Sequence, residues 1–253
     1  MPKSISVFFP AYNDAPSLPE LIGETFRVLR QCADDYEVVV VNDGSFDQTA
    51  EVLARLAEEF APHLRVITHA QNRGYGGALR SGFAAATKEL VFYTDGDGQY
   101  DVGELPRLLA LMGPEIGLVN GYKLERNDPW HRICIGSVYN AFARAIFGIR
   151  LRDVDCDFRL VRRHILESIQ LTSTSGTICV ELVRKLEMAC NVAEVGVHHY
   201  PRLHGRSQFF RMRSLAVTLG QLVKLWIRLV ALPAIAPSAL SVDEPAPQRF
   251  SPK

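Results

Sequence analysis

The sequence predicts an α/β fold with a mostly parallel central sheet that helices cover on both faces. Short runs rich in Val, Ile and Phe alternate with amphipathic stretches of helical length through the first half of the chain. Such runs are typical of strands buried on both faces of a parallel sheet. Clusters of Asp, Asn and Gly follow three of the predicted strands. Because ligands bind at the carboxyl ends of the strands in such sheets, these clusters predict one shared site.

The first half of the chain supplies four strands and three helices. The strands are predicted at residues 4–9, 36–41, 64–68 and 90–93. The helices are predicted at residues 18–32, 47–60 and 76–87. Ser17 and Glu20 have the spacing of a capping box in front of the first helix, and Asp47 is suited to cap the second.

The second half of the chain is less regular. It predicts a fifth strand at 116–121, a helix at 132–147, a polar loop at 153–163 that enters a strand or a helix, a helix at 177–189 and a strand at 192–200. Three units are expected along the chain: a catalytic domain over 1–212, a basic amphipathic helix over 213–233 and a disordered Pro-rich tail over 234–253.

The amphipathic helix has the composition of a membrane-surface segment. No Asp or Glu occurs between residues 195 and 242, whereas six Arg or Lys residues do. One face carries the apolar residues Leu215, Leu219, Leu222, Trp226 and Leu229. The opposite face carries Thr218, Gln221, Lys224 and Arg228. This pattern is suited to an interface with anionic headgroups, and ordinary packing against the domain is the alternative.

Composition excludes several other classes of protein. The 253 residues carry a formal net charge of zero, which does not indicate nucleic-acid binding. The five cysteines include no CxxC pair, which argues against a disulfide framework or a zinc site and favours a reducing compartment. The N-terminus lacks a signal-peptide pattern, and no run reaches the roughly 20 apolar residues of a membrane span.

Asp95-Gly96-Asp97 is the central chemical signal. Two carboxylates one residue apart at a strand end are suited to hold Mg²⁺ or Mn²⁺ against a diphosphate, and Gln99 adds a neutral oxygen at the next alternate position. The glycines let the backbone approach a ligand closely. An EF-hand is excluded because Pro106 stands where its last glutamate is required.

Two other strand ends carry candidate nucleotide contacts. Asp43 is suited to bind a base or a ribose, and its structural alternatives are helix capping or an Asx turn with Ser45. Tyr12 is suited to stack on a base, or to pack at the strand end. Gly74, Gly76 and Gly77 form a Gly-rich turn that matches no GxGxxG or Walker sequence.

Taken together, the segments resemble the family-two glycosyltransferases, and within them the dolichyl- and polyprenyl-phosphate mannose or glucose synthases. The resemblance extends from about residue 5 to 208. It rests on PAYND, VNDGSFDQT, NRGYGGALRSGF, DGDGQYD, DFRLVRR and the segment Arg202-x-x-Gly205-x-Ser207.

This resemblance implies the GT-A fold, with a Rossmann-like nucleotide-binding half, and an inverting displacement at the anomeric carbon. It implies that the nucleotide is bound by Pro10, Tyr12, Asp14, Val41 and Asp43. It implies that Asp95, Gly96 and Asp97 meet the diphosphate, with Asp97 and Gln99 as the closest metal ligands. Arg202 would close over the donor, together with the position of Gln208, and Lys123 and Arg132 would face an acceptor phosphate.

The chain departs from the family pattern at four places. Asp14 replaces the usual Glu, Gln208 replaces the usual Lys, and Gly136 replaces a serine that here stands one position later. Asp155 and Asp157 replace small residues. The departures leave the acceptor open.

Three functions are therefore compared. The first is transfer of a hexose from a UDP- or GDP-sugar to a polyprenyl phosphate by an enzyme at the inner, cytoplasmic face of a membrane. The second is transfer to a hydroxyl group, with Asp155 or Asp157 as the general base. The third is a non-catalytic nucleotide-sugar-binding module, against which the intact Asp95 and Asp97 argue. The nucleobase, the sugar and the oligomeric state stay open.

Overall fold

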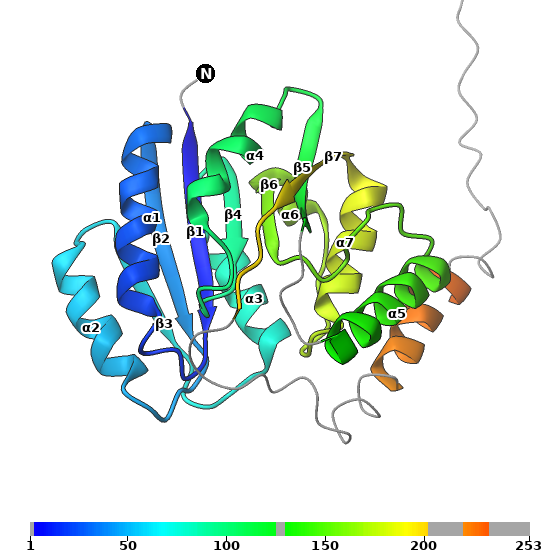
Figure 1. Ribbon diagram of the computed structural model, residues 1–253, viewed down its shortest axis with the longest axis horizontal. Coiled ribbons are helices and arrows are strands. Elements are labelled where there is room, and N and C mark those ends of the chain that lie inside the picture. Colours follow the sequence, from blue (N-terminus) through cyan, green and yellow to red (C-terminus); the bar gives the residue numbers. More distant parts are fainter. Residues whose placement is uncertain (1–2, 125–129, 202–219, 233–253) are drawn as a thin grey trace, which may run out of the picture.

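A computed structural model describes residues 3–124, 130–201 and 220–232, without the side chains of 130–132 (Figure 1). The molecule is built on one seven-stranded sheet of order β3-β2-β1-β4-β6-β5-β7. The strands are β1 (Ser4–Ala11), β2 (Asp35–Asn42), β3 (Leu64–Thr68), β4 (Leu90–Thr94), β5 (Ile116–Lys123), β6 (Phe158–Arg162) and β7 (Asn191–Val197).

The sheet is mostly parallel, as predicted. β1 pairs in parallel with β2 and β4, β2 with β3, and β5 with β7. β6 is antiparallel to both of its neighbours, β4 and β5. The carboxyl ends of β1, β2 and β4 consequently lie side by side at one edge, and β6 begins at that edge.

Helices cover both faces of the sheet, which confirms the predicted layers. They are α1 (Leu18–Cys32), α2 (Thr49–Glu59), α3 (Tyr75–Ala85), the 3₁₀ helix η1 (Val102–Glu104), α4 (Leu105–Leu111), α5 (Trp130–Phe147), α6 (Arg163–Ser168), α7 (Ile178–Ala189) and the π-helical η2 (Ile227–Ala231). One core contains apolar residues of α1, α2 and α4, and the other contains those of α3, α5, α7 and the helical segment 220–232. η1 and α4 were not predicted, whereas the polar segment 153–163 does enter a strand, β6, which α6 follows.

Alternation along β1 shows how the strands produce two cores. Val7 and Phe9 lie in one core and Phe8 lies in the other, and all three are fully buried. Because successive side chains of a strand point to opposite faces, an unbroken apolar run fills both layers at once.

One local prediction was wrong, and one alternative left open is decided for a single residue. Ser17 does not form a capping box, because its hydroxyl donates to the carbonyl oxygens of Asp14 and Gly96 at 3.0 and 2.8 Å. Leu222 is 5% exposed and belongs to a protein core, which fits the alternative that this helix packs against the domain. Trp226 donates from its indole nitrogen to the carbonyl oxygen of Ile146 at 3.2 Å, so this helix packs on α5. Residues 213–219 and the tail 234–253 lie outside the described residues.

Candidate active site

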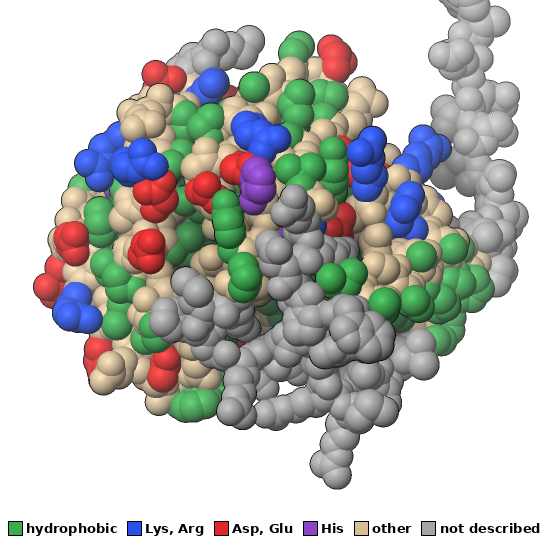
Figure 2. Space-filling view, viewed as in Figure 1, with side chains coloured by type: hydrophobic (Ala, Val, Ile, Leu, Met, Phe, Trp, Pro, Cys, Tyr) green, Lys and Arg blue, Asp and Glu red, His purple; other side chains and the backbone are tan. Residues whose placement is uncertain are grey.

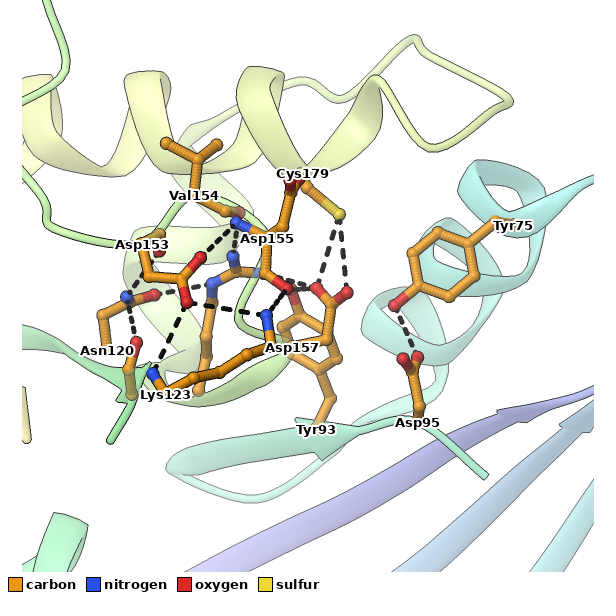
Figure 3. A network of polar contacts seen from close by, with 12 residues as sticks. Tyr75, Tyr93, Asp95, Asn120, Lys123, Asp153, Val154, Asp155, Asp157 and Cys179 are labelled. Carbon is orange, nitrogen blue, oxygen red and sulfur yellow. Dashed lines mark hydrogen bonds and ion pairs between the residues drawn. The ribbon is translucent and has the colours of Figure 1, made fainter. Parts of the chain in front are cut away.

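The Asp95-Gly96-Asp97 segment forms the loop that follows β4, at the shared edge of the sheet. The Tyr75 hydroxyl, from the first turn of α3, donates to Oδ1 of Asp95 at 2.7 Å (Figure 3). Oδ1 of Asp97 accepts the backbone N–H of Gln99 at 3.1 Å. Each carboxylate thus has one oxygen fixed by the protein, which sets the orientation of both groups.

Gly96 is required because the loop is pressed against the end of β1. A Cβ atom at Gly96 would lie 2.7 Å from the carbonyl oxygen of Pro10, which is closer than any side chain tolerates. On the other side, the Gly96 carbonyl oxygen accepts the Ser17 hydroxyl. The two contacts hold the carboxylates beside the PAYND segment, as the sheet topology predicts.

The loop concentrates negative charge in a partly enclosed place. Burial is the largest cause that raises the pKa of Asp95 well above its usual value, and repulsion from Asp157 and Asp97 raises it further. A divalent cation would relieve this repulsion, so the donor set fits Mg²⁺ or Mn²⁺. No group of three or more His, Cys, Asp or Glu residues in the described chain could complete a metal site. Mg²⁺ in proteins is often held by one or two carboxylates together with water and substrate phosphates.

Gln99 is held toward the segment after β7. Its Nε2 donates to the carbonyl oxygen of Tyr200 at 3.0 Å, and its backbone carbonyl accepts the Tyr200 N–H at 2.8 Å. This leaves the Oε1 atom of Gln99 as its possible ligand atom. Its metal-binding role stays a prediction.

Asp43 lies at the end of β2 and is 3% exposed. Its Oδ1 faces Nδ1 of His69 at 2.6 Å and accepts the backbone N–H of Arg73 at 2.9 Å. The Ser45 N–H that was suggested as the Asx-turn donor to Asp43 instead donates to Oδ1 of Asn42, three residues earlier, at 3.1 Å. The Asp43 carboxylate is thus held by residues that follow β3.

Tyr12 and Asp14 lie on the loop after β1. Oδ2 of Asp14 accepts the Tyr12 N–H at 2.9 Å, and the Asp14 N–H donates to the Thr49 hydroxyl at 3.1 Å. The Tyr12 ring meets the Phe46 ring edge to face at 6.0 Å. Phe46 is 82% exposed, so an aromatic surface lies open beside the predicted base site.

Pro10 and Val41 have buried side chains. Any contact they make with a nucleotide must come from their backbone atoms.

Lys123, at the end of β5, is the cation that the structure describes near the predicted acceptor side. Its Nζ donates to the carbonyl oxygen of Asp155 at 2.7 Å and lies 3.5 Å from Oδ2 of Asp153. Burial is the largest single cause and would lower the pKa of Lys123, but Asp153 and the other acidic groups nearby together outweigh it, so the pKa is raised. Lys123 therefore remains a cation, and its contacts with the described residues use two of its three N–H donors.

The two alternative bases have different environments. Asp157 is 9% exposed, and its Oδ1 accepts from Nη1 of the fully buried Arg159 at 2.7 Å and from the Tyr93 hydroxyl at 3.2 Å (Figure 3). These bonds commit Asp157 to an internal ion pair, so it is unsuited to act as a base. Burial is the largest cause that raises the pKa of Asp155 to about 7. Asp155 is therefore the better candidate of the two.

Three predicted site residues are not placed by the structure. Arg202 and Gln208 lie outside the described residues. Arg132 belongs to α5, but its side chain lies outside the description.

Sequence reasoning missed Tyr75 and His69, although a local signal existed for Tyr75. Cβ atoms at Gly74 and Gly76 would each lie 2.5 Å from a carbonyl oxygen, of Thr174 and Ser173 respectively. The two glycines on either side of Tyr75 therefore mark a close contact between the start of α3 and the backbone of Ser173 and Thr174. This contact places Tyr75 where its hydroxyl reaches Asp95. His69 carries no comparable signal, because its partner Asp43 is distant in sequence.

Comparison with known proteins adds a family match to this geometry. A model of the family described as glycosyl transferase family 2 matches residues 6–170. An undecaprenyl-phosphate 4-deoxy-4-formamido-L-arabinose transferase of Enterobacter sp. (strain 638) is 32% identical over 211 residues, which are 83% of this chain and 64% of that relative. The chain thus spans slightly less than two thirds of the length of this curated relative.

Solved structures support the fold. A glucosyl-3-phosphoglycerate synthase from Mycobacterium tuberculosis, in complex with Mn²⁺, UDP and glucosyl-3-phosphoglycerate, has a TM-score of 0.67 at 20% identity, over 90% of this chain and 80% of that one. A mannosyltransferase from Pyrobaculum calidifontis, in complex with GDP-Man and Mn²⁺, has a TM-score of 0.62 at 21% identity, over 90% and 65% of the two chains. At these identities the similarity establishes the GT-A fold alone.

Proposed function

Because the chain belongs to glycosyl transferase family 2, we propose that it transfers a hexose from a UDP- or GDP-sugar to a polyprenyl phosphate, with inversion at the anomeric carbon. The observation that carries the proposal is the paired carboxylate loop Asp95–Asp97 at the sheet edge that also holds Asp43. The named activity of the Enterobacter relative supports a lipid-phosphate acceptor.

The carboxylates would hold Mg²⁺ or Mn²⁺, which when bound neutralises the charge of a leaving diphosphate. Tyr75 keeps Asp95 in place through its hydroxyl, and Ser17 anchors the Gly96 carbonyl. The protein thereby orients its anionic groups before the donor arrives, which lowers the cost of ordering them during the reaction.

A lipid phosphate does not require a protein base. The second pKa of a phosphate monoester is about 6, so the acceptor is largely a dianion at neutral pH. What the acceptor needs is a positioned cation, and Lys123 offers one at the end of β5. Arg132 is proposed as the second cation.

A hydroxyl acceptor is the second candidate, because one observation favours it. The pKa of Asp155 is raised to about 7, where a carboxylate becomes an effective general base. Asp155 is therefore the residue whose substitution separates a phosphate acceptor from a hydroxyl acceptor.

We also propose that the enzyme reaches its lipid from the membrane surface through α5 and the helical segment 220–232. Apolar side chains gather over the α5 region in Figure 2. On α5 these exposed residues are Ile135, Val138, Phe142 and Ile146, and on the segment 220–232 they are Val223, Trp226, Ile227 and Leu232. Neither helix contains an acidic residue, which suits a surface of anionic headgroups. Within the described chain, no helix combines the length and the apolar character needed to cross a bilayer.

A product assay tests the transfer. The protein is incubated with Mn²⁺ and radiolabelled UDP- or GDP-sugars, together with either undecaprenyl phosphate or a water-soluble saccharide. We expect label in the organic phase only with the lipid phosphate, and no label there with Asp97→Asn. Asp101→Asn is the matched control, because Asp101 is an exposed aspartate four positions further along the chain. Full activity of Asp97→Asn would refute the metal-holding role, and label on the saccharide alone would refute the lipid acceptor.

A further inference from the structure

A buried chain of three side chains lies behind the predicted nucleotide site. His69, 4% exposed, places its Nδ1 atom 2.6 Å from Oδ1 of Asp43 and its Nε2 atom 2.9 Å from the Ser81 hydroxyl. The His69 backbone is anchored as well, because its N–H donates to the Asn42 carbonyl oxygen at 2.9 Å. The residues come from the end of β2, the position after β3 and the middle of α3.

The hydrogen-bond roles in this chain follow from the chemistry of its ends. An ionised carboxylate only accepts, so Nδ1 of His69 carries the hydrogen that binds Asp43. In the neutral imidazole the Nε2 atom then accepts from the Ser81 hydroxyl, which fixes both the tautomer and the plane of the ring.

The consequence for Asp43 is that its two oxygens are no longer equivalent. Oδ1 receives two donors, Nδ1 of His69 and the Arg73 N–H at 2.9 Å, which fill its lone pairs. Oδ2 has no bond to a residue that the structure describes. Among the described residues, Oδ2 of Asp43 is not a buried atom left without a partner, so it stays available to a ligand at the end of β2.

We infer that His69 is a positioning residue: by occupying Oδ1 it leaves Asp43 a single oxygen, Oδ2, with which to accept hydrogen bonds from a nucleobase. The site would thereby select uridine over guanosine donors, an inference that rests on the proposed function. Uracil presents one N–H, at N3, between two carbonyl groups, and a single oxygen satisfies it. Guanine presents N1–H and N2–H side by side, which pair best with both oxygens of a carboxylate. With Oδ1 already filled, guanine would leave one donor unpaired in a partly buried site, and such a loss is costly.

Calorimetric titration with UDP and GDP in the presence of Mn²⁺ tests this inference. We expect wild type to bind UDP at least about tenfold more tightly than GDP, a preference in the range of one unpaired hydrogen bond. His69→Ala should lower UDP affinity about tenfold and bring the two affinities close together. His69→Asn should keep most of the preference, because its Nδ2–H can take the place of the ring Nδ1–H.

Two controls separate positioning from general damage to the fold. His63→Ala removes an exposed histidine whose Nδ1 lies 3.2 Å from the Tyr36 carbonyl oxygen, and it should leave the UDP-to-GDP ratio unchanged. A UDP analogue methylated at N3 should bind wild type about tenfold more weakly than UDP, and His69→Ala should show little further loss with it. Melting temperatures of all variants check that they are folded.

The outcomes distinguish the inference from the function on which it rests. Wild type that binds GDP as tightly as UDP, or His69→Ala that keeps the wild-type ratio, would overturn the inference and leave the proposed transfer intact. Wild type that binds neither nucleotide would overturn the proposed function and the inference with it.

Discussion

Glu181 offers a sharp test of how the loop behind the active site is held. It is fully buried on α7, and its carboxylate accepts the N–H groups of Thr172 and Ser173 at 3.1 and 2.8 Å and the Nζ of Lys185 at 2.7 Å. The Ser173 carbonyl oxygen in turn lies against Gly76, next to Tyr75. Glu181→Gln should therefore destabilise the loop that supports Tyr75.

The size of the effect follows from the pKa of Glu181. Burial alone would raise this pKa, but the hydrogen bonds from Lys185 and Ser173 outweigh burial and lower it from 4.5 to about 2. A shift of this size corresponds to about 3 kcal/mol of stability. Because the folded-state pKa is depressed, the contribution is complete above pH 4.5 and is lost as the pH falls toward 2. Between pH 7 and pH 3.5 the linkage relation gives a loss of roughly 1.4 kcal/mol.

Urea unfolding at pH 7 and pH 3.5 measures this contribution. Glu181→Gln should have a free energy of unfolding about 2–3 kcal/mol below that of wild type at pH 7. Between pH 7 and pH 3.5 the variant should lose roughly 1.4 kcal/mol less of this free energy than wild type loses. The control is Glu167→Gln, whose carboxylate is 57% exposed in an i,i+4 pair with Arg163. If Glu181→Gln and wild type lose the same stability on acidification, the argument from the Glu181 hydrogen bonds is wrong.

Three further predictions test other parts of the structure. Gly76→Ala places a Cβ atom 2.5 Å from the Ser173 carbonyl oxygen and should lower the free energy of unfolding by about 1–3 kcal/mol. Gly23→Ala is the control, because a Cβ atom there meets open space and should not lower it. Thermal unfolding that ranks the two variants the other way would contradict the contact. Val138→Glu, at a 69% exposed site on α5, should weaken cosedimentation of the protein with anionic vesicles. Met188→Glu, at a 68% exposed site outside the proposed membrane surface, should not weaken it. Equal binding by both variants would remove α5 from the membrane contact. If the acceptor is a hydroxyl, the rate of transfer should rise with pH through about 7 as Asp155 loses its proton. Asp155→Asn should abolish that rise. A pH–rate profile that this variant leaves unchanged excludes Asp155 as the base.

Local sequence was sufficient for most elements of the first half of the chain. The helix predicted at 18–32 and the strand at 64–68 have the observed bounds. These elements follow from the period of apolar residues, which depends on near neighbours. The same holds for the position of the Asp95-Gly96-Asp97 loop, because a polar cluster directly after a buried strand must lie at the end of that strand.

Contacts between distant residues were beyond the sequence pattern. The position of β6 between β4 and β5 depends on which strands pair, and no local period records the choice of partner. Leu222 has the spacing of a lipid-facing residue, yet a core is available and buries it. An amphipathic pattern gives the apolar face of a helix but not what covers that face.

The candidate site divides in the same way. The sequence by itself determined the fold class and which carboxylates stand at the edge of the sheet. Only the tertiary structure decided that Asp157 is committed to the buried Arg159, and that His69 occupies one oxygen of Asp43 from 26 positions away. The physical reason is that a carboxylate's role depends on its burial and on the donors around it, and the folded chain brings those donors from separate elements.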